Sequence, residues 1–154
     1  MNIEIVEATI DHAVALAPRL RERDAAEVYA SGGFTPERAL RASVTASELA
    51  WTALFDGRPE VMWGAAPYLY NDGNMGVVWL LSSDEMYRVP GRFIEESHNY
   101  VSIMLERFDT LFNYVHAANI KSQQWLEMLG FHAVSRNDNY GHAGESFILY
   151  ARSK

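Results

Sequence analysis

The sequence predicts a mixed α/β fold, in which one sheet carries helices on its faces. Apolar and acidic residues alternate over residues 3–9, which is typical of a strand. In the second half, strand-like and helix-like segments alternate, whereas the middle reads as a meander of strands. Hydrophobic residues make up 49% of the 154 residues, so we expect a single domain, residues 1–154, with a core that needs no disulfides.

Helices are expected before the first hairpin, and local signals mark their ends. Thr9 is a good N-cap for the first helix, which Pro18 interrupts. A second helical stretch, residues 19–33, ends at a glycine pair, and glycine often follows a helix. Thr35 and Pro36 predict the start of a third helix, because threonine caps well and proline suits the first helical position.

The middle of the chain predicts strands joined by tight turns. Residues 51–67 read as a hairpin with its turn at Asp56 and Gly57, and residues 70–76 form a second turn. Residues 77–83, "VVWLLSS", are apolar without interruption until the two serines. Such a run predicts a central strand that is buried on both faces.

Helices and strands alternate after this central strand. The expected elements are a helix from near Phe93, a strand over residues 110–118, a helix over 119–129, and strands over 131–136 and 145–152. Gly130 is expected to end the second of these helices. The two closing strands are joined by a polar loop, residues 137–144, "NDNYGHAG".

Composition excludes several classes of function. The net charge of −7 argues against a nucleic-acid partner, because such proteins need a basic face. The absence of cysteine excludes disulfides and thiolate chemistry and fits a cytoplasmic location. The first residues include early acids and no long apolar run, so we expect no signal peptide and no membrane partner. The five histidines show no i, i+4 pair, so no metal site is expected.

Residues 119–131, "NIKSQQWLEMLGF", resemble a motif of the GNAT N-acetyltransferases. That family commonly has an asparagine, a small residue three positions later, a tyrosine at seven, and glycine and phenylalanine at eleven and twelve. The positions that fit are Asn119, Ser122, Gly130 and Phe131. Leu126 departs from the pattern, because many family members have there the tyrosine that protonates the departing thiolate.

Residues 88–93, "RVPGRF", resemble the pyrophosphate loop of the same family, which reads Arg/Gln-x-x-Gly-x-Gly/Ala. The resemblance implies acetyl-CoA or CoA as the cofactor, with its diphosphate held by backbone N–H groups at a helix N-terminus. The implied binding residues are Arg88, Val89, Gly91, Arg92 and Phe93. Pro90 has no N–H to offer, and Phe93 departs from the small third residue, which limits how closely a diphosphate approaches. Judged from these residues alone, an ordinary strand-to-helix turn is the alternative to a phosphate-binding loop.

A closer resemblance is to the GNAT-like proteins of short-tailed bacteriophages and prophages, among them an internal virion protein. Residues 78–88 and 105–131 carry it most specifically, and residues 24–64 more loosely. It implies a mostly antiparallel sheet with splayed central strands. It also implies a location in the host-cell cytoplasm or in the virion, and a phage or host protein as an alternative partner.

The resemblance implies a second set of cofactor contacts. In GNAT folds the strand before the phosphate loop pairs its backbone with the pantetheine arm, which indicates Leu80, Leu81 and Ser82. One N–H group here is a candidate for polarising the thioester carbonyl. Asn119, Ser122 and Trp125 are the further candidates for cofactor binding. Asn119 has an alternative role as a helix N-cap, and Trp125 one in the core.

Acetyl transfer also needs a base for the amine and an acid for the thiolate. The candidate bases are Glu27, on an early helix, and His116, on a strand beside the implied acyl site, with Asp84 and Glu85 as further candidate bases. Leu126 cannot act as the acid, so Ser122, Tyr114, Tyr140 or water are the candidates. Each of these residues has an ordinary structural role as its alternative.

Two classes of function therefore stay open. The first is transfer of an acetyl group from acetyl-CoA to an amine or protein acceptor that the sequence does not identify. The second is a non-catalytic GNAT-fold protein of a phage particle, its assembly, or a host interaction, for which the acidic surface would suit a basic partner. The oligomeric state is open, with a homodimer among the alternatives.

Overall fold

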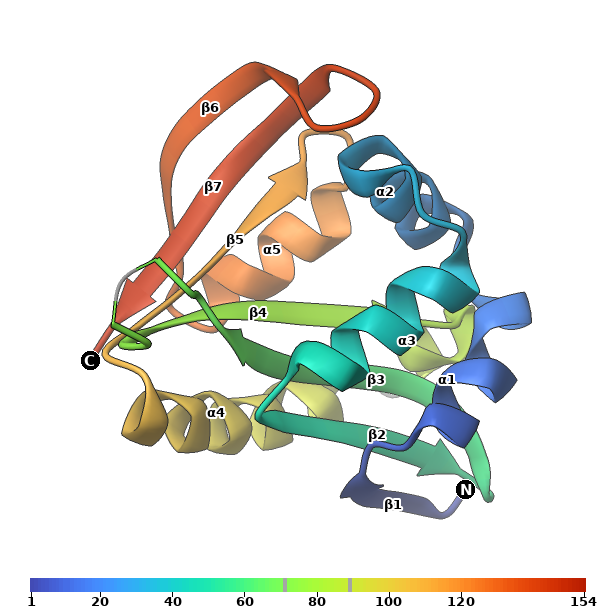
Figure 1. Ribbon diagram of the computed structural model, residues 1–154. Helices are drawn as coiled ribbons and strands as arrows, with labels where there is room; N and C mark the ends of the chain where they lie inside the picture. Colours follow the sequence, from blue (N-terminus) through green and yellow to red (C-terminus); the bar gives the residue numbers. More distant parts are fainter. Residues whose placement is uncertain (71, 89) are drawn as a thin grey trace.

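One mixed sheet organises the molecule (Figure 1). The computed structural model describes residues 1–70, 72–88 and 90–154. Within them the sheet has seven strands in the order β1-β2-β3-β4-β5-β7-β6, and only β4 and β5 run parallel. The strands are β1 Ile3–Glu7, β2 Leu49–Phe55, β3 Arg58–Pro67, β4 Met75–Ser82, β5 Thr110–His116, β6 His132–Tyr140 and β7 Glu145–Ser153. This mostly antiparallel mixed sheet confirms the predicted fold class.

Helices cover both faces of the sheet. They are α1 Ile10–Leu16, α2 Glu22–Gly32, α3 Pro36–Ala46, α4 Pro90–Arg107 and α5 Ile120–Met128, with short 3₁₀ turns η1 Ala17–Arg19 and η2 Asp84–Arg88. Successive side chains of a strand point to opposite faces. Accordingly Leu81 of β4 packs in a cluster with α1 and α3, whereas Leu80 packs on the opposite side near Phe93 of α4. No helix in the described ranges is long and apolar enough to cross a membrane.

Several predicted element ends are confirmed. Asp56 and Gly57 both have positive φ, 49° and 84°, as a two-residue hairpin turn requires. Thr35 caps α3 by accepting a hydrogen bond from the Arg38 N–H at 3.3 Å. Gly130 follows α5 with φ 87°, a conformation that favours glycine.

Three element bounds differ from the prediction by about three residues or more. The second helix begins at Glu22 rather than at residue 19, because Arg21 is extended after the turn that contains Pro18. α4 begins at Pro90 and not near Phe93, since proline suits a first helical position. β6 runs on to Tyr140 through residues that read as a loop, because an exposed edge strand needs no apolar residues to pair with β7.

The two central strands form an open wedge. The β4–β5 ladder has only three residue pairs and ends where Val77 meets Phe112. Beyond that point the strands separate, as Figure 1 shows. The Asn113 side chain of β5 crosses the start of the gap and donates through Nδ2 to the Val78 carbonyl oxygen. The prediction of splayed central strands is therefore confirmed.

Candidate functional site

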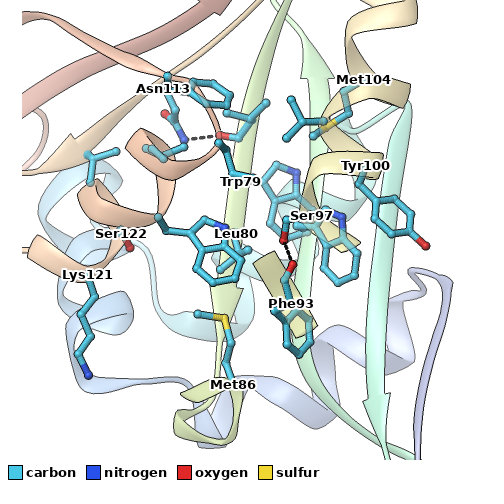
Figure 2. Close-up of a pocket in the computed structure, with 18 of the residues that line it drawn as sticks. Trp79, Leu80, Met86, Phe93, Ser97, Tyr100, Met104, Asn113, Lys121 and Ser122 are labelled. Carbon is cyan, nitrogen blue, oxygen red and sulfur yellow. Dashed lines mark hydrogen bonds between the residues drawn. The ribbon is translucent and has the colours of Figure 1, made fainter. Parts of the chain in front are cut away.

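A cavity of about 110 Å³ lies in the wedge between β4 and β5. Its walls are mainly apolar and come from β4, α4 and α5. Figure 2 shows Leu80 between Ser122 of α5 on one side and Phe93, Ser97 and Tyr100 of α4 on the other. Because β4 and β5 diverge here, the cavity reaches a part of the β4 edge that β5 does not pair with.

The backbone N–H and C=O of Leu80, called here the Leu80 peptide group, point to this open edge. The N–H and C=O of one residue point to the same edge of a strand and those of the next residue to the opposite edge, so Leu80 shares with Val78 and Ser82 the edge that faces β5. The ladder with β5 ends before Leu80, so among the described residues no strand pairs with this peptide group on that side. It offers one N–H donor and one C=O acceptor to a bound molecule.

The backbone groups of the two residues that follow Leu80 already have hydrogen-bond partners. Leu81 pairs with Met62 of β3. The Ser82 N–H donates to Asp24 Oδ2 at 3.0 Å, and the Ser82 carbonyl accepts from the Arg21 N–H at 2.8 Å. Of the three residues expected to pair with a pantetheine arm, the structure thus presents the backbone of Leu80 at the open edge.

The N-terminus of α4 borders the cavity. A Cβ atom built at Gly91 would meet nothing within 4 Å, so the backbone there is open to a ligand. Arg88 and Arg92 are exposed, in ion pairs with Glu85 at 3.0 Å and Glu96 at 3.4 Å. Exposed pairs of this kind contribute little to stability, which leaves both guanidinium groups available to an anion.

Phe93 is placed differently from what its bulk implied. Its side chain is buried, and its ring centroid lies 5.5 Å from that of Phe55. The ring therefore forms part of the cavity wall and the core, and does not fill the open space at Gly91. Val89 lies outside the described residues.

Residues of α5 form the opposite wall. Ser122, Trp125 and Leu126 all line the cavity, so Leu126 stands at the wall where the family tyrosine is expected. Asn119 is not among the lining residues. It stands at the N-cap position but makes no capping hydrogen bond with its side chain, which instead donates through Nδ2 to Glu27 Oε1 at 3.3 Å.

Glu27 is the candidate base that reaches the cavity. Its Oε1 atom accepts hydrogen bonds from the His116 N–H at 2.8 Å and from Asn119. Burial raises the pKa of Glu27 to about 7, although the hydrogen bond from His116 acts in the opposite direction. A carboxylate with this pKa is suited to accept a proton near neutral pH.

Apart from Ser122, the other candidates for the base and the acid lie outside the cavity lining. His116 Nε2 is 2.8 Å from Glu145 Oε1, and its Nδ1 accepts from the Ala118 N–H at 3.1 Å, so both ring nitrogens are engaged. Asp84 is exposed, and Glu85 is paired with Arg88. Tyr114 and Tyr140 stack on each other with their ring centroids 4.4 Å apart.

Sequence reasoning missed a buried charged pair beside Glu27. Arg21 and Asp24 are both buried and form an ion pair at 2.8 Å. Their i, i+3 spacing was the local signal, but nothing local shows that Asp24 reaches Ser82, 58 residues away. Among the residues that the structure describes, no cluster of His, Cys, Asp or Glu could hold a metal ion.

The fold is shared with acetyltransferases of known structure, although no family model and no curated protein matches the sequence. A GNAT-family acetyltransferase from Streptococcus pneumoniae is 12% identical, with a TM-score of 0.67 over 99% of this chain and 100% of that one. The Escherichia coli ribosomal-protein-S18-alanine N-acetyltransferase is 16% identical, with a TM-score of 0.68 over 99% and 94%. An aminoglycoside acetyltransferase solved in complex with coenzyme A is 12% identical, with a TM-score of 0.70 over 99% and 95%. The chain therefore has the fold of the GNAT acetyltransferases.

Proposed function

We propose that this protein is an N-acetyltransferase that transfers an acetyl group from acetyl-CoA to an amine. The observation that carries the proposal is the open wedge, in which the unpaired Leu80 peptide group and the Glu27 carboxylate reach one cavity. The first can hold a linear chain that carries amide groups, and the second can take a proton from an amine. The fold shared with acetyltransferases, one of them bound to coenzyme A, supports this proposal.

The residues present fit a CoA-type cofactor. Acetyl-CoA would supply the acetyl group as a reactive thioester. The Leu80 peptide group would pair with the pantetheine arm, and the open backbone at Gly91, with the α4 N-terminus behind it, would receive the diphosphate. Arg88 and Arg92 would add charge-assisted hydrogen bonds to phosphate oxygens.

Protons would be handled from the two sides of the cavity. Glu27 Oε2 makes no hydrogen bond among the described residues, so it is free to accept the proton of the attacking amine. On the opposite wall, the Ser122 hydroxyl is the proposed hydrogen-bond donor to the leaving thiolate, which would take its proton from water, since Leu126 has no proton to give. Asn119 would hold the Glu27 side chain in position and would not contact the substrate.

Calorimetry with acetyl-CoA and with CoA tests this function. We expect micromolar binding by the wild type, and about tenfold weaker binding by the R88A/R92A variant, because two phosphate contacts are lost. R38A/R41A removes the same charge from exposed positions on α3 and is the matched control, expected to bind like wild type. Absence of binding by the folded wild type would remove the enzyme function.

Leu126 favours a second candidate function. The wall position where the family tyrosine is expected has no acidic proton, which fits a protein that keeps the fold without the reaction. Residues 78–88 and 105–131 resemble phage GNAT-like proteins, so the second candidate is a non-catalytic phage virion, assembly or host-interaction protein. A folded protein that binds no CoA and co-purifies with phage particles would favour it.

A further inference from the structure

The helix α2 carries two carboxylates that each hold one strand of the wedge. Asp24 and Glu27 are three residues apart and therefore lie on the same helix face. Asp24 Oδ2 accepts from the Ser82 N–H at the end of β4, at 3.0 Å. Glu27 Oε1 accepts from the His116 N–H at the end of β5, at 2.8 Å. The two acids thus replace, across the open end, the hydrogen bonds that the diverging strands no longer make to each other.

The Asn119 amide lies against both carboxylates. Its Nδ2 atom donates to Glu27 Oε1 at 3.3 Å, and its amide also acts on Asp24, whose pKa burial raises and this amide lowers. The side chain is only 1% exposed, and its Oδ1 atom is a buried acceptor with no partner among the described residues. An unpaired buried acceptor is costly. A carboxyl group beside it could provide the missing donor, but only when that group is protonated.

The hydrogen bonds indicate which carboxyl group holds this proton. Both oxygens of Asp24 accept, Oδ1 from the Arg21 guanidinium at 2.8 Å and Oδ2 from Ser82. In Glu27 only Oε1 accepts, and Oε2 has no partner in the described part of the chain. A proton on Glu27 Oε2 therefore breaks no hydrogen bond of the network, whereas a proton on Asp24 would weaken its ion pair.

We propose that Asp24, Glu27 and Asn119 form one titrating unit that holds a single proton between its two carboxyl groups, with Asp24 and Asn119 as positioning residues for Glu27. The assignment of Glu27 as the base rests on the proposed function, but the shared proton does not. The protonation state of Glu27 would therefore affect the hydrogen bonds by which α2 holds the ends of β4 and β5.

The surroundings of the unit agree with this assignment. The charged and titratable groups around it are Arg21 at the start of α2, Asp84 and Tyr87 in η2, His116 with its partner Glu145, and Lys121 of α5, which lines the cavity and lies over the Tyr87 ring. Arg21 balances the charge of Asp24, whereas Glu27 forms no ion pair with a lysine or arginine among the described residues. Burial raises the pKa of both acids, and the charge of Asp24 raises the pKa of Glu27 further.

Titration of the wild-type protein, followed by ¹³C NMR of the two carboxyl carbons, tests the unit without any assay of turnover. Strongly interacting groups titrate in two steps that belong to the pair. We therefore expect each carbon to report both steps, with the upper step near pH 7 on Glu27. Two independent single steps, or a Glu27 midpoint at the ordinary value of a glutamate, would overturn the proposal.

A variant pair tests the coupling itself. D24N removes a like charge, so the Glu27 midpoint should fall by roughly one pH unit. E22Q removes the same charge from an exposed position on α2 and should leave the midpoint in place. An unchanged midpoint in folded D24N would overturn the proposal, and if D24N does not fold, the wild-type titration decides. Loss of the proposed function would show as absent CoA binding, which the titration does not depend on.

Discussion

The backbone N–H of His116 donates to Glu27 Oε1 at 2.8 Å, although 89 residues separate the two along the chain. This bond attaches α2 to the end of β5 at the point where β5 has already separated from β4. The carboxylate that it holds also lines the wedge cavity. One interaction therefore serves both the fold and the proposed chemistry, and the two roles can be separated by experiment.

Activity should follow the ionisation of Glu27. Only the ionised carboxylate accepts a proton, so kcat/KM should rise as pH increases through about 7, the pKa of Glu27. Glu27→Gln should lower kcat/KM by about a hundredfold or more and remove this rise. Initial rates over a pH series, with the acceptor amine held well below its KM, would measure it. Wild-type activity in Glu27→Gln would contradict the role of Glu27 as the base.

The same substitution should stabilise the fold at high pH. The folded-state pKa of Glu27 is raised, so between pH 4.5 and 7 the folded state binds more protons than the unfolded state. Stability from this group is fully present below pH 4.5 and is lost as pH rises through 7. Glu27→Gln removes the cost of burying the charge, on the order of 2 kcal/mol at pH 8, and should raise Tm there. At pH 4 the wild type and the variant should melt at similar temperatures, and a Tm difference of equal size at both pH values would contradict this account.

Leu126→Tyr should increase turnover. The side chain at this position lines the cavity, so a tyrosine hydroxyl there could protonate the leaving sulfur. The gain in kcat should be about tenfold, below the usual range of general acid catalysis, because a thiolate leaves readily without help. Leu126→Phe adds the same ring without the hydroxyl and is the control. Equal rates in the two variants would show that the proton does not come from this position.

Substitutions at Gly91 should separate stability from cofactor binding. Gly91→Ala meets no neighbouring atom and should stabilise α4 by up to about 1 kcal/mol, because alanine is the better helix former. Leucine is also a good helix former, but in Gly91→Leu its side chain would occupy the space proposed for the diphosphate. We expect it to weaken CoA binding by roughly tenfold with Tm preserved. Calorimetry and thermal melting of both variants would measure it, and equal affinities would place the diphosphate elsewhere.

Phe108 should be a main determinant of stability. Its side chain is fully buried in the cluster that joins α4 to β5, and its ring packs where a Cβ atom at Gly76 would lie within 2.7 Å. Phe108→Ala should lower the free energy of unfolding by about 3–5 kcal/mol, through lost burial and the cavity left behind. Ile103 of α4 is 40% exposed, and Ile103→Ala should cost much less. Urea unfolding of the two variants would compare them.

The elements that the sequence predicts well are those with local signals. The turn at Asp56 and Gly57, the cap at Thr35 and the helix end at Gly130 each depend on the backbone preference of one or two residues. Residues 137–140 misled the prediction, because asparagine and aspartate are typical of turns. As part of an edge strand, Asn137 pairs with Phe147 of β7 and Tyr140 with Glu145, while the side chains of this segment stay mostly in solvent.

The candidate site was predictable only in outline. Its place between a buried strand and a helix follows from the order of elements, and Glu27 and Ser122 were among the candidate residues. The contacts of Asp24 with Ser82 and of Asn119 with Glu27 join segments far apart in the chain. Neither residue has a local signal for such a contact, since an aspartate on a helix and an asparagine before one both have common local roles.

The short β4–β5 ladder has a mechanical consequence. Three residue pairs join the strands β1–β4 to the strands β5–β7, whereas seven pairs join β3 to β4 and seven join β5 to β7. A pulling force applied between the two chain ends would reach this seam through the sheet, and the sheet should rupture there first. The same gap that could admit a long flexible ligand would then be the place where the sheet separates under force. A ligand bound across the gap would raise the force needed to separate the two parts.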